Sequence, residues 1–158
     1  LSIKNKFNEL GYVDNLFLPT EQRDMLLFSI RNTYMITNVF SGTYVISNKL
    51  DFSFKLRYHT DQVENLNFKE VDNKGYLINT NNSVVFDDYN INYYTWTSDL
   101  SLNWWFAPGS QMSIVWKNGI DNETNNIQNS WFNNLEETFN MKQQNSLSVK
   151  IVYYLDYL

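Results

Sequence analysis

Residues 147–157 read LSVKIVYYLDY, and every second side chain in this stretch is apolar. In an extended strand these side chains share one face: Leu147, Val149, Ile151, Tyr153, Leu155 and Tyr157. At about 3.3 Å per residue and a tilt near 45°, a stretch of this length covers roughly 25 Å, the height of the apolar band of an outer-membrane barrel. A soluble sandwich would instead bury such a face against a second sheet. The stretch therefore predicts a strand that faces lipid.

The same alternation recurs upstream and divides the chain into further strands. The expected strands are residues 28–46, 50–58, 94–106 and 112–117. Residues 47–49 and 107–110 are short turns, the second built on a Pro-Gly dipeptide, and the first closes a hairpin. Residues 60–92 and 118–145 are long, polar connections. Within the second connection, residues 131–141 are expected to form one short helix.

This pattern predicts an all-β fold of antiparallel, up-and-down strands, about five of them long. Short turns at one end and long loops at the other are typical of outer-membrane barrels, in which the short turns are periplasmic and the long loops external. Five strands do not close a barrel, and an open sheet in lipid would expose unpaired backbone groups. Residues 1–158 are therefore expected to be the C-terminal portion of a larger transmembrane β-barrel. Assembly from several copies is the alternative.

Composition excludes several classes of protein. Aromatic residues make up 17% of the chain and charged residues 18%, which is too aromatic for a disordered chain. No window approaches 18 uninterrupted apolar residues, so a membrane-spanning helix is excluded. The net charge of -5 and the lack of a basic stripe argue against a nucleic-acid partner. With no cysteine, the chain has no disulfide and no thiolate chemistry.

Most charged side chains of the strands fall on the face opposite the apolar one. The basic members are Arg31, Lys55, Arg57, His59, Lys117 and Lys150. The acidic members are Asp51, Asp99 and Asp156. If this face lines the lumen, its positive charge favours anionic solutes, because field lines focus in a narrow low-dielectric tube. The alternative is that these charges solvate or brace the interior, with partners on strands outside this chain.

The sequence offers little for catalysis or metal binding. His59 is the only histidine, and a metal site needs further ligands at fitting spacing. No Gly-x-Ser-x-Gly nucleophile turn is present. The acidic residues at 87–88 and 121–123 could help to bind Ca²⁺, but they do not follow the EF-hand pattern, and solvated loop charge is the favoured account. We therefore expect no catalytic residue, no cofactor and no metal.

Six aromatic residues share the lipid-facing parity of the strands. They are Tyr94, Trp96, Trp104, Trp116, Tyr153 and Tyr157. Rings with an apolar body and a polar tip fit an aromatic girdle at the membrane interface. A sugar-stacking platform is the alternative, and the regular alternation favours the girdle. Trp131 and Phe132, in an external loop, are better candidates for contact with a ligand or partner.

Four segments resemble a single uncharacterised bacterial family. Residues 104–118 read WWFAPGSQMSIVWKN, and residues 145–157 read NSLSVKIVYYLDY. Residues 50–59, ending in RYH, are similar to that family's penultimate hairpin, and residues 8–12, NELGY, to an external-loop motif. In that family an outer-membrane β-barrel follows an N-terminal carbohydrate-binding-family-nine-like domain. The resemblance implies that the accessory domain and the N-terminal strands are absent from this chain.

Together these features predict an integral protein of the bacterial outer membrane that is not an enzyme. Its expected role is a channel, an anchor or a docking component of a larger envelope assembly, and the resemblance implies a link to glycan handling. Its expected partners are membrane lipid and either the remaining strands of the same barrel or a multi-protein envelope complex. Two alternatives stay open: a barrel-borne hydrolase with an external-loop active site, and a soluble carbohydrate-binding β-sandwich.

Overall fold

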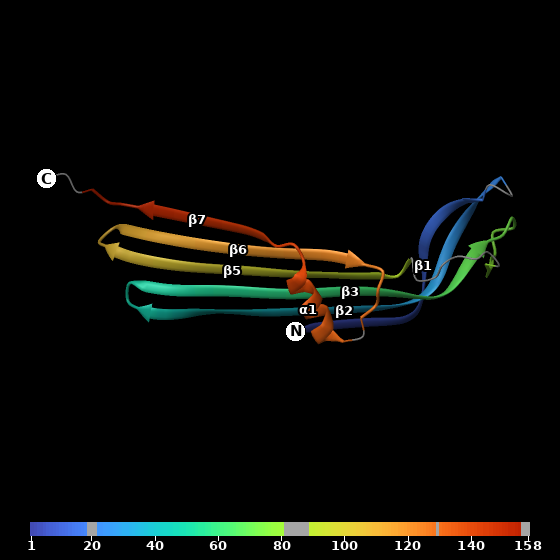
Figure 1. Ribbon diagram of the computed structural model, residues 1–158, viewed down its shortest axis with the longest axis horizontal. Coiled ribbons are helices and arrows are strands. Elements are labelled where there is room, and N and C mark those ends of the chain that lie inside the picture. Colours follow the sequence, from blue (N-terminus) through green and yellow to red (C-terminus); the bar gives the residue numbers. More distant parts are fainter. Residues whose placement is uncertain (19–21, 81–88, 129, 156–158) are drawn as a thin grey trace.

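The computed structural model describes residues 1–18, 22–80, 89–128 and 130–155. Over these residues the chain forms one antiparallel sheet of seven strands and one helix (Figure 1). The elements are β1 (Ser2–Leu18), β2 (Arg23–Ser47), β3 (Leu50–Val71), β4 (Leu77–Asn79), β5 (Ile91–Ala107), β6 (Ser110–Thr124), α1 (Trp131–Asn140) and β7 (Gln144–Val152).

The strands follow one another across the sheet in the order β1-β2-β3-β5-β6-β7, and β4 pairs with β3. The predicted all-β, antiparallel, up-and-down arrangement is therefore confirmed. The expected number of about five strands is wrong, because β1 and the short β4 were missed. Residues 8–12, expected in an external loop, lie within β1. The alternation that would have revealed β1 is broken by irregularities between Lys6 and Glu9 and between Tyr12 and Asp14.

The sheet is a single open layer, and it is not closed into a barrel. Strands β1 and β7 end the strand order, and no pairing joins them among the described residues. Strand β7 spans Gln144–Val152, so it begins and ends earlier than the predicted strand at 147–157. Beyond it, the Tyr154 backbone N–H donates to Ser110 Oγ at 3.1 Å, which holds the tail against the start of β6.

Two tight turns lie side by side at one end of the sheet, called the turn end here. The first joins β2 to β3 at residues 48–49, and the second joins β5 to β6 at residues 108–109. They are linked by a hydrogen bond from the Trp105 N–H to the Lys49 carbonyl oxygen at 2.8 Å. Gly109 has a φ of 71°, and a Cβ there would lie 2.9 Å from Tyr154 Cβ. Only glycine fits this turn without strain.

The opposite end of the sheet, called the loop end, carries the long connections. The connection after β6 contains α1, which confirms the short helix predicted at 131–141. Ser130 caps it, and its side chain accepts a hydrogen bond from the Asn133 N–H. Figure 1 shows α1 lying across the strands on one side of the sheet.

The strand register places the apolar side chains on one face, called the apolar face. Phe52 of β3 lies between Tyr44 and Leu102, and Ile114 lies between Leu102 and Val149. Between the turn end and α1 this face forms the apolar band: Phe40, Tyr44, Leu50, Phe52, Phe54, Leu56, Leu100, Leu102, Trp104, Met112, Ile114, Trp116, Leu147, Val149 and Ile151. The alternate residues form the polar face. Five consecutive strands thus keep one parity.

Near the loop end, β1, β2, β3 and β4 turn out of line with the long sheet (Figure 1). This part is called the distal extension here. Its core is Met25, Leu27 and Phe68, which are 0–1% exposed, and Leu16 and Tyr89 pack against them. The bend coincides with register irregularities in the β1–β2 and β2–β3 pairs, because a bulge bends a strand and increases its local twist.

The β2–β3 register predicts one specific crosslink in this cysteine-free chain. Thr43 Oγ1 and Ser53 Oγ lie 2.8 Å apart on the polar face. The double variant Thr43→Cys with Ser53→Cys should therefore form an intramolecular disulfide under mild oxidation, detected by peptide mass mapping. The control pair Thr43→Cys with Phe52→Cys places the thiols on opposite faces. A control that crosslinks as readily as the test pair would overturn the register.

Candidate functional site

The polar face carries a row of side-chain hydrogen bonds across three strands near the turn end. Asn103 Nδ2 on β5 donates to Asp51 Oδ1 on β3 at 2.9 Å, and Ser113 Oγ on β6 donates to Asn103 Oδ1 at 2.8 Å. Lys150 of β7 lies opposite Ser113 in the register and is exposed. The row links side chains that are far apart in the sequence.

Farther from the turn end, one carboxylate lies among three basic side chains. Arg57 Nη1 donates to Asp99 Oδ2 at 3.0 Å and to Thr97 Oγ1 at 3.2 Å. Lys55 and Lys117 are the residues opposite Asp99 on its two neighbouring strands. Arg57, Asp99 and Lys117 line a shallow hollow of about 340 Å³. This group, called the Asp99 cluster here, has more positive than negative charge.

His59 lies one step farther along the same face. Its Nδ1 is 2.8 Å from Thr37 Oγ1, and its ring meets the Tyr93 ring edge to face, with centroids 6.3 Å apart. A hydroxyl and an aromatic ring hold the imidazole in place. The structure therefore places His59 beside the Asp99 cluster, two residues after Arg57 on β3.

Arg31 does not join the other basic side chains. It lies toward the distal extension, where its guanidinium passes directly over Gly11, so that a Cβ at Gly11 would clash with it. Arg31 lines a separate pocket of about 230 Å³ with Tyr12 and Asn65. The predicted set of lumen charges thus divides into two places. Asp156, one of the three predicted acidic members of the set, lies outside the described residues. Residues 87–88 of the possible calcium site lie outside them as well.

The expected aromatic girdle is spread over three heights of the apolar face. Trp104 and Tyr153 lie at the turn end, where both rings contact Phe106, at centroid distances of 5.5 and 6.2 Å. Trp116 lies in the middle of the band, between Leu100 and Leu147. Tyr157 lies outside the described residues. Trp104 and Tyr153 therefore gather around Phe106 at the turn end.

Tyr94 and Trp96 lie at the third height, beneath α1. Tyr94 is 0% exposed, and its hydroxyl accepts a hydrogen bond from Asn122 Nδ2 at 2.7 Å. The Trp96 ring contacts Phe139 of α1 at a centroid distance of 5.0 Å. The helix therefore covers these two residues, and Tyr94 has no surface left to face a lipid. Period-two alternation indicates which face a residue takes, but it does not show what covers that face.

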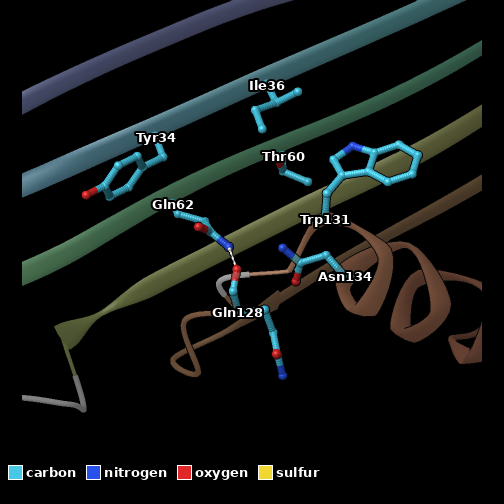
Figure 2. A pocket seen from close by; sticks show the side chains of 7 residues that line it. All are labelled: Tyr34, Ile36, Thr60, Gln62, Gln128, Trp131 and Asn134. Carbon is cyan, nitrogen blue, oxygen red and sulfur yellow. Dashed lines mark hydrogen bonds between the residues drawn. The ribbon is translucent and has the colours of Figure 1, made fainter.

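Trp131 and Phe132, the predicted external contact residues, have different surroundings. Trp131 meets the Tyr58 ring edge to face at 5.5 Å, whereas Phe132 is 75% exposed. Trp131 also lines a pocket of about 270 Å³ between α1 and the sheet (Figure 2). The other lining residues are Tyr34, Ile36, Thr60, Gln62, Gln128 and Asn134. The lining is uncharged and includes two aromatic side chains, three amides and the Thr60 hydroxyl.

A buried amide network, missed by sequence reasoning, attaches α1 to the sheet. Asn92 is 0% exposed, and its Nδ2 donates to Asn134 Oδ1 at 3.0 Å and to the Asn126 carbonyl oxygen at 2.9 Å. Gln62 Nε2 donates to Asn92 Oδ1 at 3.1 Å and to the Gln128 carbonyl oxygen at 2.9 Å (Figure 2). In an asparagine-rich chain these residues look like loop residues. No local pattern marks them as buried partners.

The described residues offer no group of three or more His, Cys, Asp or Glu side chains that could hold a metal ion. A search of the same residues finds no helix that is long and apolar enough to cross a membrane. What the polar face can do chemically is attract and hydrogen-bond solutes, since its charges are partly exposed and of mixed sign.

The entire chain, residues 1–158, matches a family described as a domain of unknown function, DUF5916. The chain belongs to the DUF5916 family. Comparison with curated proteins and with solved structures gave no match. Membership of an uncharacterised family is thus confirmed, whereas a barrel and an N-terminal carbohydrate-binding domain are no part of the DUF5916 description. That description assigns no residue roles, so roles in this chain rest on its own geometry.

Among the contacts of this DUF5916 chain, the Arg57–Asp99 pair allows a direct energetic test. Both side chains are about one-third exposed, at 39% and 33%, so solvent screens the pair. A double-mutant cycle with Arg57→Ala and Asp99→Ala should give a coupling of about 0.2–1 kcal/mol in the free energy of unfolding, measured by denaturant titration.

The control cycle combines Arg57→Ala with Asp51→Ala, because these residues share the polar face at a separation of roughly 20 Å along β3. That distance exceeds the Debye length of about 10 Å, so their coupling should be near zero. Equal coupling in the two cycles would refute a specific Arg57–Asp99 interaction.

Proposed function

We propose that this chain is part of the wall of an outer-membrane β-barrel, with its apolar face toward lipid and its polar face toward the lumen. The observation that carries the proposal is the exposure of the apolar band. On β7, Leu147, Val149 and Ile151 are 67%, 57% and 63% exposed, and no second sheet covers them in the described part of the chain. Soluble monomers rarely leave so continuous an apolar surface in water.

The dimensions of the band support the same proposal. On β3 the aromatic and aliphatic side chains run from Leu50 to Tyr58, at the border beside α1, over about 26 Å at 3.3 Å per residue, and transmembrane strands need about 9–11 residues. On β5, β6 and β7 the run is shorter, because Ser98, Asn118 and Asn145 occupy this face at the level of Leu56. Aromatic side chains mark both ends, with Trp104 at the turn end and Trp96 beside α1. Aromatic belts flank the apolar band of membrane barrels.

The polar face supports the assignment of a lumen. Its side chains bond to one another across strands, as Asn103 does with Asp51 and Arg57 with Asp99. Barrel interiors are polar, and their side chains alternate with the lipid-facing ones. By this orientation, the turn end is periplasmic and the loop end is external, as the asymmetry of connection lengths in outer-membrane barrels indicates.

The two edges of the sheet support a larger assembly. Strands β1 and β7 end the strand order, so each has one side without a partner strand among the described residues. In lipid, unpaired backbone groups cost several kcal/mol each. We therefore propose that further strands pair with both edges, supplied by the same barrel or by a partner in the outer-membrane complex.

The proposed role is a non-enzymatic channel, anchor or docking component. The Asp99 cluster holds one carboxylate among basic groups, whereas a hydrolase would bring together a carboxylate pair or a Ser-His arrangement. A soluble sandwich would require a second sheet over the apolar band. A link to glycan handling is supported only by the sequence resemblance.

Adjacent residues of β7 provide a matched test of the two faces. Val149 lies in the middle of the band, and Ser148 faces the polar side opposite Val115. Val149→Arg should destabilise the protein folded in lipid vesicles by about 2–4 kcal/mol, because it places a charge near the bilayer midplane. Ser148→Arg should change it far less. Equal damage from the two substitutions would contradict the assigned faces.

Extraction of native membranes tests the location independently. An integral barrel should remain in the pellet after alkaline carbonate washing and enter solution only with detergent, because its apolar band needs hydrocarbon contact. The measurement is an immunoblot of both fractions. Quantitative release by carbonate would refute membrane integration and favour the soluble sandwich.

A further inference from the structure

Helix α1 lies where the apolar band ends. Its first residue, Trp131, contacts Tyr58 on β3, and Phe139, near its last turn, contacts Trp96 on β5. The helix axis therefore crosses the strands, as Figure 1 shows. Tyr58 and Trp96 lie opposite each other in the register, at the loop-end border of the band. The helix thus follows that border.

The two most buried residues of α1 are polar, which is unusual for a helix on an apolar face. Asn134 is 3% exposed and Thr138 is 0% exposed, and Asn134 Oδ1 accepts a hydrogen bond from buried Asn92. Thr138 Oγ1 donates back to the Asn134 carbonyl oxygen at 2.7 Å. Hydrogen bonds thus help to hold α1 in place, together with the ring contacts of Trp131 and Phe139, and leave Phe132 exposed.

Those apolar side chains share one flank of the helix. Phe132, Leu135 and Phe139 follow the i, i+3, i+7 spacing of a single helical stripe. Phe132 is 75% exposed and Phe139 is 44% exposed. Of the polar residues, Asn133 and Glu137 lie toward the opposite flank, whereas Glu136 and Asn140 point away from the sheet, with Glu136 one turn after Phe132. Apolar and polar side chains therefore occupy different parts of the exposed surface of the helix. In an ordinary amphipathic helix, they would separate its buried side from its exposed side.

The apolar flank points toward the apolar band. Phe139 packs on Trp96, whereas Asn134 bonds to Asn92, which lies closer than Trp96 to the loop end of β5. The apolar stripe thus continues the band, and the polar flank faces the loop end. In the proposed orientation, these two flanks face the acyl chains and the external water.

We propose that α1 is an interfacial helix that rests in the headgroup region of the outer leaflet, with its Phe132–Leu135–Phe139 stripe inserted beside the barrel wall. This inference rests on the proposed function. Amphipathic helices bind at this depth through buried apolar area and through basic groups. The helix has no basic residue, so its affinity for lipid comes from the apolar stripe. By fixing the border of the band, α1 sets the depth of the wall in the membrane.

The absence of cysteine from the sequence permits a clean fluorescence test. Single variants Phe132→Cys, Asn133→Cys and Val149→Cys are labelled with an environment-sensitive dye, and the protein is reconstituted into phosphatidylcholine vesicles. Phe132 and Val149 are exposed surface positions, so neither substitution disturbs a core. The readouts are the emission maximum and quenching by a lipid brominated near its headgroup.

We expect the emission maxima of the dyes at positions 132 and 149 to be blue-shifted relative to a free conjugate of the same dye in buffer without detergent. Only the dye at position 132 should be quenched strongly by the lipid that is brominated near its headgroup. The adjacent dye at 133, on the polar flank, should remain red-shifted and unquenched. A blue-shifted 149 dye with a water-exposed 132 dye would overturn the interfacial helix alone. A water-exposed 149 dye would overturn the proposed function, and the helix assignment with it.

Discussion

In every strand pair of the long sheet, the residues of the apolar face on one strand lie opposite residues of the same face on the next strand. The rule holds from Tyr44 and Phe52 through Leu102 and Ile114 to Val149. Because side chains alternate with period two, a slip of one residue in a single pair would move a whole strand's apolar side chains to the polar face. The apolar band and the Asp99 cluster both exist only while this register is kept.

The apolar band ends where the side chains on the same strands change from apolar to polar. On β3 the apolar face passes from Leu56 and Tyr58 to Thr60 and Gln62, and on β5 it passes from Trp96 to Asn92. Buried amides need partners, since an unpaired polar group away from water costs about 1–3 kcal/mol. The β6–β7 connection supplies those partners through Asn134 and the backbone of residues 126 and 128. One hydrogen-bonded network therefore ends the band and places the helix.

Sequence reasoning identified what short-range patterns encode. The two tight turns, the alternation of β2, β3, β5 and β6, and the helix after residue 130 follow from local residue types. Strand β1 was missed because its bulges break the period, and the end of β7 was overestimated because alternation continues past Val152. The burial of Tyr94 and the separation of Arg31 from Arg57 depend on contacts with distant segments, which no local period encodes.

The distal extension closes a hydrophobic cluster of its own. Met25, Leu27 and Phe68 pack with Val13, Leu16, Leu18 and Tyr89, and none of these belongs to the apolar band. Its strands are nonetheless continuous with β1, β2 and β3, interrupted only at the bulges. The shared strands therefore carry two separate apolar regions, the cluster of the distal extension and the apolar band. Sub-global opening can therefore unfold the extension while the hydrogen-bonded ladder of the long sheet stays intact. Its amides would then exchange faster than those of the long sheet.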